Sequence, residues 1–191
     1  MVTRASAPPY RGEGPRALWH VSEDPTITRF APHRAATALT DEPFVWAVDT
    51  RHLPLYWFPR DCPRCTFWAG VRTNEADLTR FLDGRRELRV HLIEEDWLER
   101  VRNARIYLYR LPVESFAEDR EISGYWMSRA TVDPLELVEI DDLIGRHAAA
   151  GIRLRPVPNL WPLWDAVVRS TLEFSGIRLR NAVARPDPNG R

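Results

Sequence analysis

The residues best suited to chemistry lie in and around residues 43–69. An elbow in this stretch places Arg60 and Asp61 between two prolines, and Arg64 directly follows the second one. Such a cluster either forms an ion network that fixes the elbow, or binds a carboxylate or phosphate between the two guanidinium groups while Asp61 holds them. Prolines on both sides make the elbow rigid, which suits both interpretations. The sequence leaves both open, and Arg60 and Arg64 are candidate anion-binding residues.

The same elbow carries two cysteines, Cys62 and Cys65. A structural zinc ion needs four ligands, and the histidines are not spaced to complete such a set. A redox pair is expected between a strand and the start of a helix, whereas Cys65 begins a predicted strand. We therefore interpret both cysteines as structural and predict no metal site.

A histidine and a serine share one face of the first predicted strand, residues 17–22. Alternation along this strand places Leu18, His20 and Ser22 on one side. A histidine in a short apolar strand is usually a hydrogen-bonded core residue. The nearby serine strengthens the alternative, in which both polar groups point toward a ligand.

Acidic residues crowd the loop that follows the predicted strand 104–111, namely Glu114, Glu118, Asp119 and Glu121. A solvated loop is the ordinary interpretation. The alternative is that one carboxylate faces a cation that develops in a reaction. That alternative requires His20 and an aromatic wall to face the same cleft.

Aromatic residues supply such a wall. Trp46 lies on a predicted strand at 44–48, and Tyr56 lies on a short helix or turn at 51–58. Apolar walls beside polar groups are typical of pockets for small or nucleotide ligands. They are equally typical of an ordinary core.

Composition limits the class of protein. The chain has 191 residues, 44% hydrophobic residues and a formal net charge of +0, so no overall field draws it to nucleic acid. No apolar stretch reaches the roughly twenty residues of a membrane span. The start of the chain has no apolar secretory segment, so we expect a cytoplasmic protein.

Periodicity predicts one α+β domain at 16–183, with disordered tails at 1–15 and 184–191. We expect a curved, largely antiparallel sheet flanked by short helices, with strand 17–22 beside strand 104–111. The predicted strands are 17–22, 44–48, 65–69, 88–93, 104–111, 123–128, 135–140, 152–155 and 176–181. Helices are predicted after a cap at Thr73 or Asn74, at 94–101, after Asp141 and after Asn159.

Several motifs resemble known families. LWHVSEDPTITRF, FVWAVDTRHLP, PRDCPR, SGYWMS and NLWPLWD resemble a bacterial domain family of unknown function, across nearly the whole predicted domain. More distantly, the order of the motifs is similar to that of the ADP-ribosyltransferase superfamily, in particular the rifampin ADP-ribosyltransferases. That resemblance implies a split sheet and NAD as co-substrate.

The resemblance also implies roles for individual residues. His20, with Ser22 beside it, would hold the ribose of NAD, and Trp46 with Tyr56 would stack on the nicotinamide. Glu118 or Asp119 would supply the carboxylate that stabilises the cationic ribose. Two positions depart from the family pattern, because Val21 stands where the family has glycine and Trp46 where it has tyrosine. The alternative is a non-catalytic module that binds a nucleotide or small anion through Arg60 and Arg64.

Overall fold

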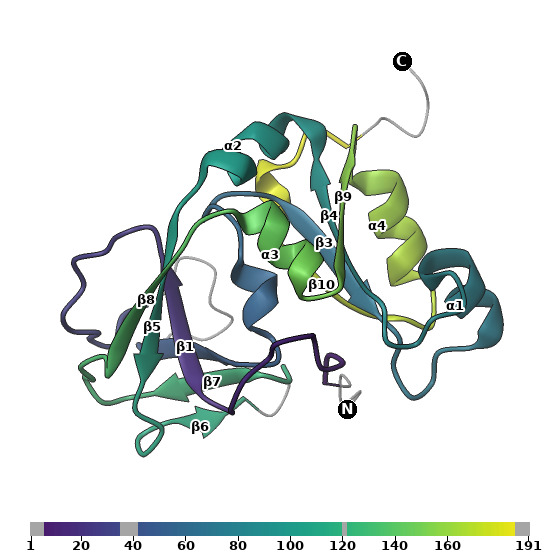
Figure 1. The fold of residues 1–191 in the computed structure, drawn as a ribbon. Helices are drawn as coiled ribbons and strands as arrows, with labels where there is room; N and C mark the ends of the chain where they lie inside the picture. The colour runs from purple at the N-terminus through teal and green to yellow at the C-terminus, as the bar shows by residue number, and fades with distance from the viewer. Residues whose placement is uncertain (1–5, 35–41, 120–121, 186–191) are drawn as a thin grey trace.

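The protein is built on two β-sheets that lie side by side (Figure 1). The computed structural model describes residues 6–34, 42–119 and 122–185. The larger sheet has six antiparallel strands in the order β6-β7-β2-β1-β5-β8. Its strands are β1 (Leu18–Ser22), β2 (Val45–Asp49), β5 (Ile106–Leu111), β6 (Ala117–Glu118), β7 (Tyr125–Ser128) and β8 (Glu136–Ile140).

The smaller sheet has four strands in the order β10-β3-β4-β9. All its neighbours are antiparallel except β4 and β9, which are parallel. Every residue of its two central strands, β3 and β4, is buried, and apolar residues alternate there with the buried polar residues Arg64, Thr66, Arg89, His91 and Glu94. The strands are β3 (Arg64–Trp68), β4 (Arg89–Glu94), β9 (Ile152–Val157) and β10 (Glu173–Ile177).

Short helices fill the space around the sheets. The side chain of Asn74 accepts a hydrogen bond from Asp77 N and so caps α1, which decides between the two predicted caps, Thr73 and Asn74. Asp142, rather than the predicted Asp141, caps α3. The helices are α1 (Glu75–Leu82), α2 (Leu98–Asn103), α3 (Leu143–Ala149) and α4 (Trp161–Val168), with 3-10 turns η1 (Leu53–Tyr56), η2 (Glu95–Trp97) and η3 (Leu179–Asn181).

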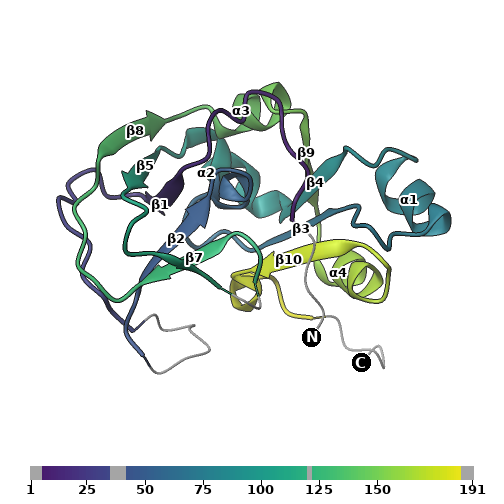
Figure 2. The same ribbon diagram turned by 90° about the horizontal axis from the view of Figure 1, so that it is seen from below.

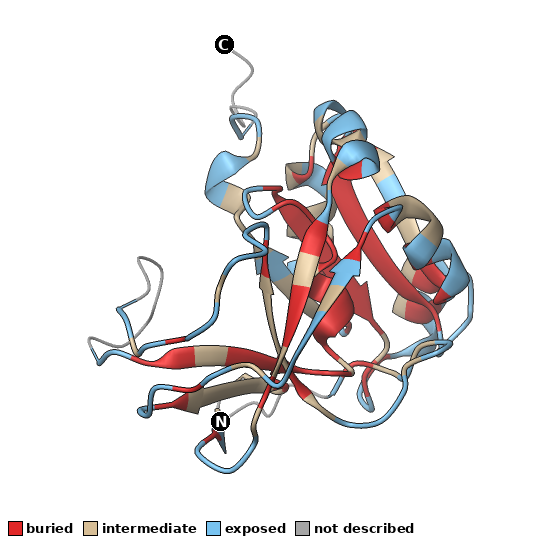
Figure 3. Cartoon of the chain, turned by 60° about the vertical axis from the view of Figure 1, so that its left-hand side comes forward, coloured by how far each residue is buried: buried red, intermediate tan, exposed pale blue. Residues whose placement is uncertain are grey.

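Two main apolar clusters hold this arrangement together. Leu78 and Leu82 of α1, and Leu160 and Val167 beside and within α4, pack on one face of the four-stranded sheet. The other cluster joins the two sheets with α2 and α3 (Figure 2). Buried residues accordingly run through the central strands, and exposed residues follow the outer helix faces (Figure 3).

The predicted α+β class with a largely antiparallel, open sheet is confirmed. The predicted neighbourhood of the first and fifth strands is also confirmed, because β1 pairs with β5 along its whole length. The sheet is split between β1 and β2. These strands pair only at Leu18↔Asp49 and Trp19↔Val48, and no further pair follows.

Two expectations differ from the structure. The last strand was expected at 176–181, but β10 ends at Ile177 and η3 follows, because the pairing with β3 fixes the strand earlier. Residues 6–15 were expected to be disordered, but Ala7 is buried and the segment is hydrogen-bonded to the domain. The rest of the two predicted tails, 1–5 and 186–191, lies outside the described residues.

Candidate functional site

Four polar residues follow one another at the end of β2, from Asp49 to His52. Here the chain leaves the sheet and enters η1. Thr50 fixes the turn, because its hydroxyl donates to Pro15 O and accepts from Ala17 N (2.9 Å) and Trp19 Nε1 (3.1 Å). The turn thus ties β2 to the segment before β1.

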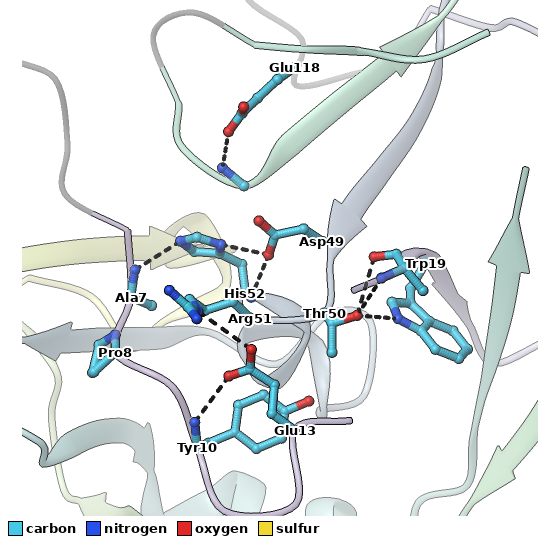
Figure 4. Close-up of polar contacts among 12 residues, drawn as sticks. Ala7, Pro8, Tyr10, Glu13, Trp19, Asp49, Thr50, Arg51, His52 and Glu118 are labelled. Carbon is cyan, nitrogen blue, oxygen red and sulfur yellow. Dashed lines mark hydrogen bonds and ion pairs between the residues drawn. The ribbon is translucent and has the colours of Figure 1, made fainter. Parts of the chain in front are cut away.

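Asp49 and His52 form a buried pair in this turn (Figure 4). Asp49 Oδ1 lies 2.8 Å from both the backbone N and the Nδ1 of His52. The other ring nitrogen, Nε2, accepts from Ala7 N at 3.1 Å. A backbone N–H can only donate, so Nε2 is the acceptor and Nδ1 carries the proton toward Asp49. The geometry therefore fixes the tautomer of His52.

The electrostatics of the pair favour an ionised carboxylate. Burial raises the pKa of Asp49, but the hydrogen bonds from the side chain and backbone of His52, together with the charge of Arg16, outweigh it, so the pKa lies below its usual value. A carboxylate in this position orients an imidazole and stabilises the protonated form if a proton arrives at Nε2. The pair has the arrangement of a general base.

A glycine turn covers the imidazole. Gly124 has φ +82°, and a Cβ at this position would lie 2.0 Å from His52 Nδ1. Its carbonyl accepts from Asp49 N at 2.9 Å. The carboxylate of Glu118 lies beyond this turn and accepts from Gly124 N at 3.4 Å (Figure 4). Only glycine permits this close approach, which places the predicted catalytic Glu118 one residue away from the Asp49–His52 pair.

A small hollow opens beside His52. Its volume is about 20 Å³, which is room for about one water molecule while residues 7–16 are in place. Its polar lining comes from His52, Ser123, Tyr125 and Ser175, and its apolar lining from Leu55, Trp68, Ile122 and Phe174. The hollow therefore lies between the two sheets, with His52 in its wall.

Tyr56 and Arg64 lie deeper than the sequence suggested. The hydroxyls of Tyr56 and Tyr125 are hydrogen-bonded, and burial followed by Tyr125 raises the pKa of Tyr56 well above its usual value. The Arg64 guanidinium donates to Leu55 O (2.7 Å) and Cys62 O (2.8 Å) and is buried. Arg64 thus supports the backbone of the elbow from inside, which gives the anion-binding interpretation no support from this residue.

The other elbow residues lie at the surface. Arg60 is exposed, and its backbone N donates to Glu23 Oε2 at 3.2 Å. The carboxylate of Asp61 lies 3.9 Å from Arg178 Nε. The structure therefore separates Arg60 from Arg64, and the charged partner of Asp61 is a residue from the far end of the chain.

His20 and Trp46 meet across the split between β1 and β2. His20 Nδ1 lies 2.9 Å from Trp46 O, and its ring lies 4.7 Å from that of Phe30. Burial lowers the pKa of His20, and the charge of Arg60 acts in the same direction. The Trp46 indole packs edge-on against Phe44, and its buried Nε1 has no partner among the described residues.

Ser22 and Asp119 hold local turns. Ser22 is buried on the same strand as His20, and its hydroxyl accepts from Asp24 N at 3.1 Å. Asp119 accepts from Ile122 N at 2.9 Å and so closes the loop before β7. Glu121 lies outside the described residues.

Cys62 and Cys65 are free and buried. Burial raises the pKa of each thiol to about 12, so both remain protonated and unreactive in the folded protein. Among the described residues, no group of three or more His, Cys, Asp and Glu side chains could hold a metal ion. No helix in the described part of the chain is long and apolar enough to cross a membrane.

Sequence reasoning missed Asp49, His52 and Gly124. A signal was available, since Asp-x-x-His directly follows a buried strand and the spacing lets the side chain of Asp49 reach the start of the next turn. The role of Gly124 depends on a contact over 72 positions of sequence, which no local pattern contains.

No curated protein and no solved structure matches the chain. The resemblance to ADP-ribosyltransferases therefore stays a prediction. The expected membership of a family of unknown function is confirmed by one match. Residues 19–182 match the family of unknown function DUF6886, and the chain belongs to that family.

Proposed function

We propose that this protein binds NAD or a closely related nucleotide on one face of the six-stranded sheet and transfers ADP-ribose from it. The observation that supports the proposal is the row of residues on that face. Residues directly opposite in neighbouring strands share a face, and both Glu118 and Ala47 are opposite Trp126. The Glu118 carboxylate on β6, the Trp126 indole on β7 and Ala47 on β2 therefore follow one another across the sheet. Strand β2 is the neighbour of β1, which carries His20.

His20 belongs to the same face. Leu18 is opposite Asp49, and alternation then gives His20 the face of Leu18, Asp49 and Ala47. Three strand spacings separate β6 from β1, about 14 Å at the usual spacing. This is a span suited to a ligand with several rings rather than a small ion. The Trp46 side chain alternates to the other face, so Trp126 is the better candidate for stacking. Its indole is half-buried against the apolar cluster of Leu18 and Ala47, so a ligand has to stack on the part that this cluster leaves uncovered.

The role proposed for each residue follows from its hydrogen bonds, its ring contacts and its exposure. Trp46 O can only accept, so His20 carries its proton on Nδ1 and leaves Nε2 to accept from a ribose hydroxyl. The Phe30 ring lies against His20, so a ligand that reaches Nε2 has to displace this ring or stack on it. The exposed Glu118 carboxylate would stabilise the positive charge on the ribose when the bond to nicotinamide breaks.

Calorimetric titration with NAD tests the binding step, and nicotinamide release tests the chemical step. We expect His20→Ala to weaken NAD binding by about tenfold, the value of one hydrogen bond. We expect Glu118→Gln to leave binding nearly unchanged and to lower nicotinamide release about a hundredfold. Glu114→Gln, in the same loop and exposed, is the matched control and should change neither.

Two outcomes count against the proposal. Absence of NAD binding at millimolar concentration would exclude both steps. Binding without nicotinamide release, unaffected by Glu118→Gln, would leave the non-catalytic nucleotide-binding module as the function.

A further inference from the structure

We propose that Asp49 and His52 form a second, general-base site, which the N-terminal segment of residues 7–16 keeps covered. The ligand of this site is an aromatic ring with a hydroxyl or N–H group, which takes the place of Ala7. A base at His52 does not require NAD, although Glu118 is linked to His52 through the Gly124 turn. It is supported by the covering contact, by the hollow beside it and by the way the segment is attached.

The covering contact already shows what His52 recognises. Nε2 accepts from Ala7 N, while Nδ1 donates to Asp49, so a group that replaces Ala7 must also donate. When the donor is a hydroxyl, its O–H bond breaks, the proton goes to Nε2 and the electron pair stays on the oxygen. The imidazolium that results keeps its Nδ1–H on the Asp49 carboxylate, which stabilises it.

The hollow indicates the kind of ligand. Trp68 and Phe174 provide apolar walls and Ser123 is a polar lining residue, whereas the Tyr125 hydroxyl is already hydrogen-bonded to Tyr56. Ala7 is 1% exposed and packs on Trp68, so the segment now occupies part of this apolar surface. Apolar walls with few polar groups select a ring that carries one donor.

Two glycines between the covering residue Ala7 and strand β1 provide a hinge about which the segment can move away from His52. Gly12 and Gly14 have φ values of +75° and +74°, and a Cβ at either position would meet nothing within 4 Å. Two such glycines between the cover and β1 can change conformation without moving other residues.

Several contacts hold the covered state. Arg11 N donates to Ala150 O at 3.1 Å, and Tyr10 packs edge-on against Trp57 with 5.4 Å between the ring centroids. Glu13 pairs with Arg51 at 3.5 Å, and Arg89 donates to Pro8 O, so opening requires these contacts to break together. The covered state is stable, and the open state is a minor population.

Acylation by diethyl pyrocarbonate, which reacts with neutral accessible imidazole, measures this opening in the wild-type protein. His33 is exposed and serves as the fast reference, whereas His91 and His147 are completely buried and serve as the slow references. We expect His52 to react at least about tenfold faster than His91 and His147, because local opening costs less than global unfolding. Reaction of His52 no faster than these two would overturn the proposal.

A variant that lacks the covering donor sharpens the test. Ala7→Pro removes the N–H that caps Nε2, and Ser6→Pro makes the same change at an exposed neighbour whose N–H is not needed. We expect Ala7→Pro to accelerate acylation of His52 about tenfold and Ser6→Pro to leave it unchanged. Equal effects of both substitutions would show that the donor does not matter. If Ala7→Pro fails to fold, the acylation rates of His52, His91 and His147 in the wild-type protein still test whether the segment opens.

Two probes test the base and the ligand. With 4-nitrophenyl acetate, His52 takes a proton from water, the hydroxide attacks the ester carbonyl and 4-nitrophenolate leaves. We expect Ala7→Pro to hydrolyse this ester faster than wild type, and His52→Gln in the same protein to remove the gain. Phenol should protect His52 of the Ala7→Pro protein from acylation, and anisole, which lacks the donor, should not. No gain in hydrolysis, or equal protection by both compounds, would contradict the proposal.

Discussion

Two pairs of buried side chains in the described part of the chain contain histidine, namely Asp49 with His52 and His91 with His147. In the first, His52 lies between the carboxylate of Asp49 and a backbone N–H, and it lines a hollow. In the second, His147 donates from Nδ1 to Leu143 O at 2.6 Å and accepts from His91 at 3.1 Å. The far nitrogen of His91, Nε2, is buried without a partner among the described residues.

The partners decide what each pair can do. The carboxylate behind His52 accepts from Nδ1, and the acceptor nitrogen Nε2 lies under the N-terminal segment. Burial lowers the pKa of His147 to about 4, and burial followed by the charge of His147 lowers that of His91 well below its usual value. The second pair therefore stays neutral and acts as part of the core between Phe58 and Trp57. A buried histidine indicates chemistry only when an acid and an opening accompany it.

The largest expected effect concerns the Gly124 turn, which lies against the imidazole of His52. Gly124→Ala would place a Cβ 2.0 Å from His52 Nδ1 in a left-handed backbone conformation, and we expect a loss of about 4 kcal/mol in the free energy of unfolding. Gly84→Ala is the matched control, because Gly84 has φ +71° but nothing within 4 Å, and we expect a loss of about 1 kcal/mol. Urea denaturation measures both. Equal losses would mean that contact with the imidazole contributes nothing.

The next effect concerns the pair without a carboxylate. The ordinary pKa of histidine is 6.5, so below this pH the unfolded chain takes up protons that native His147 does not accept until about pH 4. Stability is therefore present above pH 6.5 and falls as the pH falls, by about 3 kcal/mol from His147 alone. His91 acts in the same direction.

Denaturation of wild type and of the double variant His91→Leu, His147→Leu at pH 7 and pH 4.5 checks this expectation. The double variant should lose much less stability between the two pH values than wild type, whatever its stability at pH 7. His33→Gln, at an exposed histidine, should leave the pH dependence unchanged. An unchanged slope in the double variant would assign the acid sensitivity to other groups.

The smallest effect separates hydrogen bonding from charge in the first pair. Asp49→Ala leaves the Nδ1–H and the backbone N–H of buried His52 without their acceptor, and we expect a loss of about 2 to 3 kcal/mol. Asp49→Asn keeps an acceptor oxygen and should lose less than half as much. Asp96→Ala, at an exposed carboxylate, should lose almost nothing. Equal losses for the two Asp49 variants would show that the charge, rather than the hydrogen bonds, stabilises the turn.

Local pattern predicted most of the fold. Alternation in ARIYLYRL indicated β5, and Thr73 or Asn74 indicated the start of α1, because both signals depend on neighbours within one element. The two-residue strand β6 is too short to give a period, and it was missed for that reason. The N-terminal segment looked disordered because it is rich in proline and glycine, yet side chains of His52 and Arg89 satisfy its backbone.

The site was predicted less well than the fold. The shared face of His20 and Ser22 followed from alternation along one strand. The burial of Arg64 could not be predicted, since its partners are the carbonyls of Leu55 and Cys62 and backbone groups carry no signal in the sequence. The Asp49–His52 pair gains its meaning from Ala7 and Gly124, which only the folded chain brings to it.

The position of β3 in the smaller sheet has a consequence for synthesis of the chain. One edge of β3 pairs with β4, which follows soon after, but the other edge pairs with β10, and Thr66 Oγ1 donates to Ser175 O across 109 positions of sequence. On the ribosome, that edge of β3 therefore waits unpaired until β10 has emerged. Such non-local pairing makes folding slow. A chain that stalls before Glu173 presents the unpaired backbone of β3 to other chains, and the four-stranded sheet is the part of the protein most prone to aggregate during translation.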